Sequence, residues 1–239
     1  MKRIIGHRGW ASKAPENTIH GFKLALEDER VWAIECDVHL TKDKKIVVAH
    51  DPTLNRCSDG TGFISQHTYE ELLQYDFGGW FGEEFKDTKI MLYKDLLKLI
   101  DGKKRLVCEI KSEYGFNNDI AQYILAESEG VPHDMLCFKS FDHRIMKSLA
   151  DAGCTYDLGL LYMDKPLLLV EELKACGCNF LSMLYWNYDQ KIFDELKEAG
   201  IDCYAWTVDT IENSDYMYQI GNHEVAIITN KPQLFFDYR

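Results

Sequence analysis

The stretch Ala33-Ile34-Glu35-Cys36-Asp37-Val38-His39-Leu40-Thr41-Lys42-Asp43-Lys44-Lys45-Ile46-Val47-Val48-Ala49-His50 contains two apolar, strand-like runs, Ala33–Val38 and Lys45–His50. Only a short polar connection separates them. Two neighbouring parallel strands need a crossover of about a dozen residues or more. The second run is therefore expected to return antiparallel to the first, as the second arm of a hairpin.

Outward from this hairpin, apolar runs of strand length alternate with amphipathic helical segments, a pattern typical of an α/β fold with a parallel sheet. The expected strands are Arg3–His7, Ala33–Val38, Lys45–His50, Arg105–Ile110, Met135–Ser140, Asp157–Tyr162, Asn179–Met183, Asp202–Val208 and Val225–Thr229. The expected helices are Pro15–Arg30, Tyr93–Ile100, Asn118–Glu129, His143–Ala152, Pro166–Cys176, Gln190–Ala199 and Ile211–Ile220. Setting the hairpin arm aside leaves the eight strands of a TIM (β/α)8 barrel.

The length of 239 residues suits one such barrel, so residues 1–239 are expected to form a single catalytic domain. The stretch Asp51–Ile90 fits neither the strand nor the helix period and is rich in Gly, Asp, Thr and aromatic residues. A structureless loop of that length is uncommon in a compact domain. We therefore predict a small insertion after the second strand, at the barrel mouth, whose expected core is Phe77, Trp80, Phe81 and Phe85.

Charge and cysteine content limit the expected binding partners and the expected cellular compartment. The formal net charge of −12 argues against nucleic acid or an anionic membrane as a general partner. No apolar run approaches the roughly 18 residues of a membrane span, so no stable membrane association is expected. Residues Met1–His7 look like a first strand and not like a signal peptide. The eight cysteines mostly lie in apolar segments, which favours reduced thiols and a cytoplasmic location.

Ionisable residues end several of the expected strands, where barrel enzymes place their chemistry. They are His7, Arg8, Glu35, Asp37, His50, Glu109 and Lys111. Glu35 and Asp37 are two residues apart, so their side chains share one face of a strand, as do those of Glu109 and Lys111. Converging carboxylates would repel each other without a cation, and oxygen ligands favour Mg²⁺ or Ca²⁺ over zinc. The two histidines suit general acid–base catalysis on a phosphate ester.

The length of the hairpin loop decides whether His50 joins these carboxylates. A two-residue loop would place His50 directly opposite Glu35 or Asp37, and directly opposed residues share a face. A three-residue loop would oppose His50 to Cys36, on the other face. The register is therefore a testable part of the site.

An ordered set of motifs over essentially the whole chain resembles the glycerophosphodiester phosphodiesterase family. The motifs are His7-Arg8-Gly9, Pro15-Glu16-Asn17-Thr18, Glu35-Cys36-Asp37 through Asp43, Val47 through Arg56, Gly60-Thr61-Gly62, Glu109-Ile110-Lys111, Ser140-Phe141-Asp142 and Ala205-Trp206-Thr207-Val208. The resemblance implies a Ca²⁺- or Mg²⁺-dependent barrel hydrolase acting on a small-molecule phosphodiester. By position it implies metal ligands at Glu35, Asp37 and Glu109. It further implies an acid–base pair, His7 and His50, and phosphate binding by Arg8 and Lys111.

The chain departs from the family pattern at a few positions. Val225-Ala226 and Asn230 stand where the family usually has Asp-Gly and Asp, Met91-Leu92 replaces Pro-Thr, and Trp10 replaces a small residue. The positions of the implied metal ligands and histidines are intact. These departures therefore bear on substrate fit more than on catalysis.

Several residues have two interpretations. Arg8 binds phosphate or pairs structurally with Glu16, and Trp206 lines the substrate site or fills the barrel. The pair Tyr185-Trp186 borders a head-group pocket or forms a contact in a homodimer. The other histidines are assigned to surface or capping positions; they are His20, His39, His67, His133, His143 and His223.

The leading hypothesis is hydrolysis of glycerophosphodiesters to glycerol 3-phosphate and an alcohol. One alternative is lysophospholipase D-type cleavage, with the aromatic residues of Phe77–Phe85 lining an acyl channel, although no basic amphipathic helix is present to dock on a membrane. Another alternative is a non-catalytic barrel that binds a phosphate ligand. The retention of all the implied ligands and both histidines argues against that last hypothesis.

Overall fold

Eight parallel strands close into a barrel in the computed structural model, which describes residues 2–112, 119–221 and 224–236. The barrel strands are β1 (Arg3–Gly6), β2 (Ala33–Leu40), β4 (Arg105–Ile110), β5 (Leu136–Ser140), β6 (Asp157–Tyr162), β7 (Phe180–Leu184), β8 (Asp202–Trp206) and β9 (Ala226–Thr229). The sheet runs β1-β9-β8-β7-β6-β5-β4-β2, and pairing of β1 with β2 closes it. The predicted TIM barrel is confirmed.

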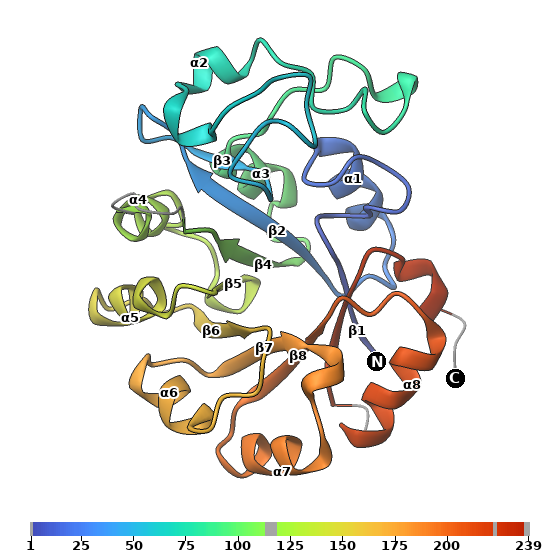
Figure 1. Ribbon diagram of the computed structural model, residues 1–239, viewed down its shortest axis with the longest axis vertical. Helices are drawn as coiled ribbons and strands as arrows, with labels where there is room; N and C mark the ends of the chain where they lie inside the picture. Colours follow the sequence, from blue (N-terminus) through green and yellow to red (C-terminus); the bar gives the residue numbers. More distant parts are fainter. Residues whose placement is uncertain (1, 113–118, 222–223, 237–239) are drawn as a thin grey trace.

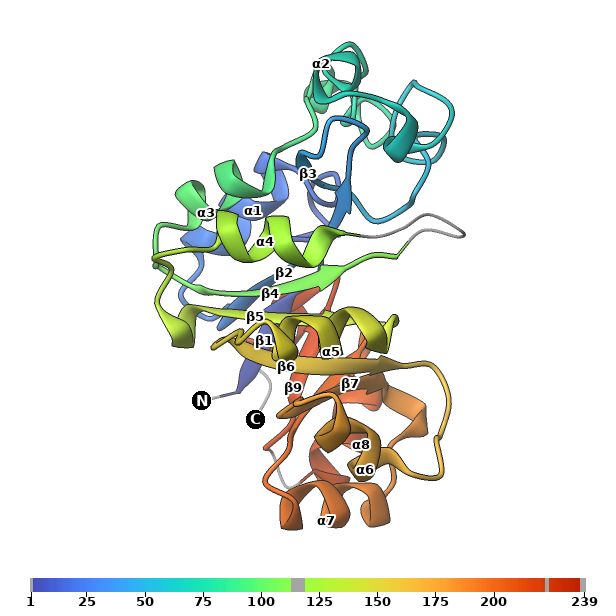
Figure 2. The same ribbon diagram turned by 90° about the vertical axis from the view of Figure 1, so that its left-hand side faces the viewer.

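Helices surround the barrel strands on the outside (Figures 1 and 2). They are α1 (Ile19–Glu27), α3 (Tyr93–Ile100), α4 (Ile120–Glu127), α5 (His143–Asp151), α6 (Leu169–Ala175), α7 (Gln190–Glu198) and α8 (Ile211–Ile220). The helix α3 is amphipathic and buries Tyr93, Leu96 and Ile100 against the barrel. The predicted start of α4 at Asn118 lies outside the described residues.

The first helix begins later than the sequence predicts. Residues 15–18 form a turn before α1 instead of its first turn, because Asn17 adopts a left-handed backbone conformation with φ 56°. Such a conformation is tolerated by asparagine better than by most residues, and a helix cannot pass through it. The turn carries Glu16 and Asn17 to the end of the barrel where the ionisable side chains lie.

Inside the barrel, an apolar layer lies on the N-terminal side of the ionisable residues. It contains Ile5, Ala33, Val107, Cys137, Phe180, Tyr204, Ala226 and Ile228. At β6 the layer has Gly159, where an added Cβ would lie 2.2 Å from the Phe180 ring, so only glycine leaves room for that ring. Since strand side chains alternate between faces, the residues two positions further along β2, β4 and β5 also point inward. These residues are Glu35, Glu109 and Lys139.

The hairpin after β2 has a three-residue loop. Strand β3 (Ile46–Val48) runs antiparallel to β2 and pairs Val48 with Val38, a register in which the connection is residues 42–44. Lys44 takes the left-handed conformation, φ 61°, that such loops require. The two-residue loop considered from the sequence is therefore wrong.

Strand β2 is long enough to pair with two strands on the same edge. Its first residues pair with β1, and its last residues, Val38 to Leu40, pair with β3. Consequently β2 projects beyond the barrel and carries the hairpin and the following insertion with it, at the top of Figure 1.

The insertion is folded, with short helices η1 (Ile64–Gln66), α2 (Tyr69–Leu72) and η2 (Glu83–Phe85). Its core differs from the aromatic core predicted. The buried cluster consists of Val47, Leu54, Ile64, Leu72, Phe77, Ile90 and Leu92. Of the four predicted aromatic residues only Phe77 belongs to it, and Trp80 is 42% exposed. Aliphatic side chains that lie far apart in the sequence, from Val47 to Leu92, fill the rest of this core.

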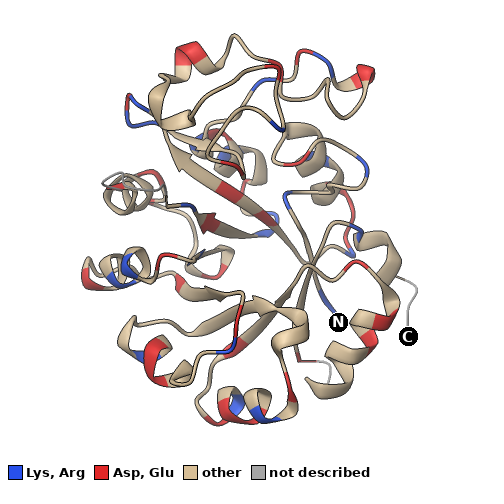
Figure 3. Cartoon of the chain, in the orientation of Figure 1, with Lys and Arg blue, Asp and Glu red and all other residues tan. Residues whose placement is uncertain are grey.

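Figure 3 shows charged residues on the outer helices, of both signs on α5, α6 and α7 and only acidic on α8, and acidic residues also interrupt the ribbon of β2. Within the described part of the chain, no helix is both long and apolar enough to cross a membrane.

Candidate active site

Three carboxylates converge at the C-terminal ends of β2 and β4. Oxygen atoms of Glu35, Asp37 and Glu109 all lie within 4.8 Å of one another, and all three residues are buried. The parallel register explains this, since Asp37 is paired with Glu109 and Glu35 with Val107. We call these three residues the acidic triad.

Glu35 is held from two sides. The backbone N–H of Arg8 donates to its Oε2 at 3.0 Å, and the ammonium nitrogen of Lys139 lies 3.0 Å from its Oε1. Lys139 comes from β5, whose register sets it beside Glu109.

Asp37 has the densest set of contacts in the triad. The Asn17 side-chain amide donates to its Oδ2 at 2.9 Å, Arg8 Nε lies 3.3 Å from the same oxygen, and Lys111 Nζ lies 3.0 Å from Oδ1. Burial alone would raise the pKa of Asp37, but Lys111 and Arg8 outweigh it and hold the pKa well below its usual range. Asp37 is therefore ionised at neutral pH.

The negative charge of Glu109 has fewer close cationic or hydrogen-bonding partners than that of Asp37. It forms an ion pair with Lys111, and its Oε2 lies 3.9 Å from Lys139 Nζ. Burial is the largest cause that raises its pKa above the ordinary value, and the nearby charge of Asp37 adds to it against the opposing effect of Lys111. The two carboxylates that face each other across β2 and β4 thus have pKa values displaced in opposite directions.

Arg8 contacts both the triad and Glu16. Its Nη1 donates to Glu16 Oε1 at 2.8 Å while its Nε faces Asp37, so the two interpretations of Arg8 are not exclusive. Burial lowers the pKa of Arg8, but the surrounding carboxylates more than offset this and raise it, so the guanidinium stays charged. Arg56 from the insertion also binds Glu16, at 2.7 Å, and binds Asp51 at 2.8 Å.

His7 is fixed by an amide. Its Nδ1 lies 2.8 Å from Asn230 Oδ1, and Asn230 Nδ2 donates to Asp209 Oδ2 at 2.7 Å, which turns the amide oxygen toward the imidazole. Neutral His7 therefore carries its hydrogen on Nδ1 and presents the lone pair of Nε2, which lies 3.9 Å from Glu35 Oε2. Burial is the largest cause that lowers the pKa of His7, so the ring is neutral at neutral pH.

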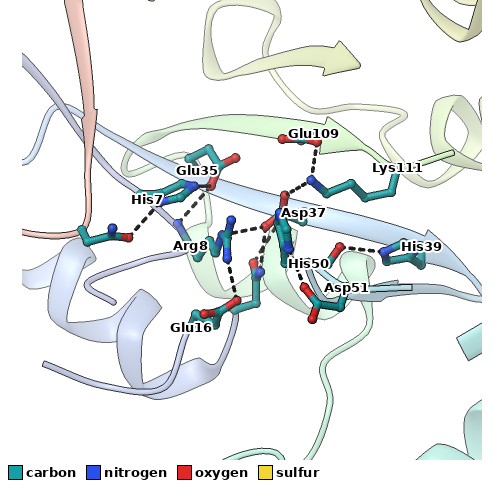
Figure 4. A network of polar contacts seen from close by, with 12 residues as sticks. His7, Arg8, Glu16, Glu35, Asp37, His39, His50, Asp51, Glu109 and Lys111 are labelled. Atoms are coloured by element: carbon teal, nitrogen blue, oxygen red, sulfur yellow. Dashed lines mark hydrogen bonds and ion pairs between the residues drawn. The ribbon is translucent and has the colours of Figure 1, made fainter. Parts of the chain in front are cut away.

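His50 reaches the same group of residues in spite of the three-residue hairpin loop. Strand β3 ends at Val48 and the ladder ends with the Ala49 N–H donating to the Asp37 carbonyl oxygen, after which the chain turns. The turn, and not the strand alternation, directs His50 toward Asp37 (Figure 4). Its Nδ1 lies 2.6 Å from Asp51 Oδ1, and His39 Nε2 lies 3.0 Å from the His50 carbonyl oxygen.

Trp206, at the end of β8, packs on the apolar layer of the barrel interior. Its ring meets Phe141 edge-on at 5.7 Å between centroids. No contact described for Trp206 joins it to the triad or to either histidine of the site, while its buried indole nitrogen has no hydrogen-bond partner among the described residues. Both filling the barrel and lining a substrate site remain compatible with this position.

Sequence reasoning overlooked Lys139 and Asn17. Lysine is almost never fully buried unless it is paired, so a lysine inside the apolar run Leu136-Cys137-Phe138-Lys139-Ser140 was an available signal. Asn17 stood in a recognised motif, but its backbone conformation is a three-dimensional property. His39, assigned to the surface, is buried and contacts the backbone of His50 instead. His223 lies outside the described residues.

The donor set of the triad fits a hard cation. All its ligand atoms are carboxylate oxygens, which Mg²⁺ and Ca²⁺ prefer. Glu35 Oε1 and Asp37 Oδ1 each lie 3.0 Å from a lysine ammonium nitrogen, and a carboxylate oxygen with one such partner still has a lone pair to offer an ion. The barrel thus brings together an acidic triad, three cationic side chains and two histidines. This combination is typical of enzymes that act on phosphate esters.

Comparison with known proteins agrees with that class. The model of the glycerophosphoryl diester phosphodiesterase family matches residues 7–234. A glycerophosphodiester phosphodiesterase of Caldanaerobacter subterraneus is 33% identical over 96% of this chain and 94% of its own length. Among solved structures, an Oleispira antarctica phosphodiesterase in complex with the product sn-glycerol-3-phosphate has a TM-score of 0.89 at 27% identity, covering 97% of this chain and 94% of that one. A Thermotoga maritima glycerophosphodiester phosphodiesterase has a TM-score of 0.79 at 26% identity, covering 100% and 99%.

The chain belongs to the glycerophosphoryl diester phosphodiesterase family and is an enzyme of that kind. The resemblance of the motifs is thereby confirmed.

Proposed function

We propose that this enzyme hydrolyses glycerophosphodiesters to glycerol 3-phosphate and an alcohol, with the acidic triad as a divalent-cation site. The observation that carries the proposal is the convergence of the triad, whose oxygens lie within 4.8 Å of one another, with Arg8 and Lys111 on its solvent side. These are the charges that a phosphodiester and a cation together require.

The triad would hold Mg²⁺ or Ca²⁺ through Glu35, Asp37 and Glu109. A cation bound there supplies Lewis-acid stabilisation of charge on the phosphoryl oxygens. Family membership and the buried oxygen donors support this site, and the choice between the two ions is part of the test below.

Arg8 and Lys111 bind the phosphoryl group. Both are held by Asp37 and keep their charge, and both side chains are partly open to solvent, at 16% and 13% exposure. Preorganised cations cost no reorganisation when negative charge grows on the phosphoryl oxygens. Trp206 is proposed to line the alcohol side of this site.

His7 and His50 divide the proton transfers. His7 is proposed as the general base, because burial lowers its pKa and its Nδ1 donates to an amide, which leaves Nε2 able to accept a proton. His50, paired with the Asp51 carboxylate, is then the general acid that protonates the leaving alkoxide.

A diester panel tests this activity. The purified enzyme is stripped with a chelator and assayed with glycerophosphocholine, -ethanolamine, -glycerol and -inositol after re-addition of Mg²⁺ or Ca²⁺. Release of glycerol 3-phosphate that depends on the added ion is the expected result. Absence of release from every diester with either ion contradicts the proposal. Turnover of lysophosphatidylcholine in place of these diesters would support a lysophospholipase D reaction.

The cellular setting is also a proposal. All eight cysteines are free thiols, which supports a reducing compartment such as the cytoplasm. Trp186 is 58% exposed in η4 (Tyr185–Asn187), after β7, and this supports a homodimer contact there.

Cation binding should stabilise the fold. At a concentration about a hundredfold above Kd, a ligand that binds only the native state adds about 2.7 kcal/mol, which corresponds to a rise in Tm of about 5–10 °C for a domain of this size. We expect Mg²⁺ or Ca²⁺ to produce such a rise in differential scanning calorimetry. The variant Glu109→Gln should lose most of it, and an undiminished rise would remove Glu109 from the ligand set.

A further inference from the structure

Lys139 is an unusual residue at this site. It lies in β5 with only 2% of its surface exposed, and its ammonium group points into the barrel between two members of the acidic triad. The nitrogen is 3.0 Å from Glu35 Oε1 and 3.9 Å from Glu109 Oε2. Lys139 therefore lies on the inner side of the triad, whereas Arg8 and Lys111 lie toward solvent.

The formal charges of the acidic triad and of the cations that contact it balance without a metal ion. The three carboxylates of the triad face three cationic side chains, Arg8, Lys111 and Lys139. Outside the triad, Glu16 and Asp51 share the guanidinium of Arg56, and Asp51 also contacts His50. The ammonium nitrogen of Lys139 faces two carboxylates, Glu35 and Glu109, which makes it their ion-pair partner inside the barrel. The mutual repulsion expected of the triad is therefore already relieved by the protein.

We propose that Lys139 is a built-in counter-ion of the acidic triad, which keeps the metal-free barrel stable and weakens the binding of a divalent cation. The inference rests on the proposed cation site at the triad and adds a positioning residue to it. Lys139 holds Glu35 in place and at the same time competes with the cation for the same oxygen.

The sign of its effect on cation affinity separates this role from a merely structural one. If Lys139 only kept Glu35 in position, its removal would disorder a ligand and weaken cation binding. If its charge opposes the cation, its removal should tighten binding. Even with the dielectric constant of bulk water, a unit charge about 5 Å from a divalent ion changes its affinity on the order of tenfold.

The experiment measures binding and stability, not turnover. The variant Lys139→Met removes the charge and keeps a long apolar side chain. Titration calorimetry with Mg²⁺ or Ca²⁺ alone should show affinity about tenfold tighter than wild type, and the Tm in chelator should be lower than wild type. Lys104→Met is the matched control, because Lys104 is also buried but donates to backbone carbonyl oxygens of Asp28 and Val31, away from the triad. Its cation affinity should equal that of wild type.

Two further variants keep the test decisive. Lys139→Gln retains a polar side chain and replaces Lys139→Met where the latter does not fold; the same tightening is expected. Adding Glu109→Gln to either variant should abolish the tightened binding and so locate it at the triad. Unchanged or weaker affinity in the folded Lys139 variants, with wild type binding normally, overturns the role of Lys139 alone. Absence of binding in wild type and variants alike overturns the proposed cation site together with it.

Discussion

Replacing His7 or His50 with alanine is expected to lower kcat on a glycerophosphodiester by about 10²–10⁴-fold, the usual contribution of a positioned acid or base. His7 lies beside Glu35 and His50 beside Asp37 (Figure 4), and each ring is oriented through Nδ1 by its own partner, Asn230 or Asp51. The losses should not add in the double variant, since removal and delivery of a proton serve one transition state. Steady-state kinetics of the single and double variants measure this.

A substrate with an activated leaving group distinguishes the two histidines. A nitrophenyl diester releases a stable anion and needs no acid, so it should restore the rate of the variant that lacks the general acid. We expect rescue of His50→Ala and not of His7→Ala. Rescue of His7→Ala instead would reverse the assignment of base and acid.

The control for both variants is His67→Ala in the insertion, whose ring contacts the Phe63 carbonyl oxygen away from the triad. It should retain wild-type kcat. Cation affinity measured by calorimetry should persist in His7→Ala and His50→Ala, because neither histidine belongs to the triad. Rates close to wild type in both variants on natural diesters would make the two histidines structural and refute the mechanism.

Replacing Asp37 with asparagine is expected to cost both stability and activity. The change removes the buried carboxylate that compensates Arg8 and Lys111, and it leaves these largely enclosed cations facing an amide. Breaking a buried ion pair from one side typically costs about 3–5 kcal/mol. Urea denaturation in chelator should show a loss of this size, free of any contribution from a bound cation. The kcat/KM should fall by about 10³-fold or more, because Lewis-acid stabilisation is worth several kcal/mol.

An exposed ion pair provides the comparison for this variant. Asp95→Asn breaks the surface pair with Lys98 within α3, and such pairs are worth at most about 1 kcal/mol. A stability loss in Asp37→Asn no larger than that of Asp95→Asn would show that the cations around Asp37 are adequately hydrated without it.

Periodicity accounts for what the sequence predicted well. The alternation of strands and helices and the impossibility of a short parallel crossover after Leu40 indicated the barrel. The two-residue spacing of Glu35 with Asp37 and of Glu109 with Lys111 correctly placed four side chains at one end of it. These inferences depend only on local geometry that a strand imposes on any sequence.

Contacts that depend on turns could not be obtained in this way. His50 lies near Asp37 because the chain leaves the ladder after Ala49, whereas the hairpin register by itself would direct it to the other face. Asn17 reaches Asp37 through a left-handed residue conformation that no periodic pattern encodes. Lys139 was predictable in principle, but a single lysine in an apolar strand indicates burial without naming its partner.

Arg56 limits which part of the insertion can be replaced by the corresponding segment of a relative. Its guanidinium clamps Asp51, the partner of His50, to Glu16, the partner of Arg8. A graft of foreign sequence that begins directly after His50 would remove these contacts and loosen the partners of both His50 and Arg8. An exchange of the insertion that aims at other alcohols should therefore begin after Arg56. The contacts of Arg56 with Asp51 and Glu16 are then retained while the rest of the insertion varies.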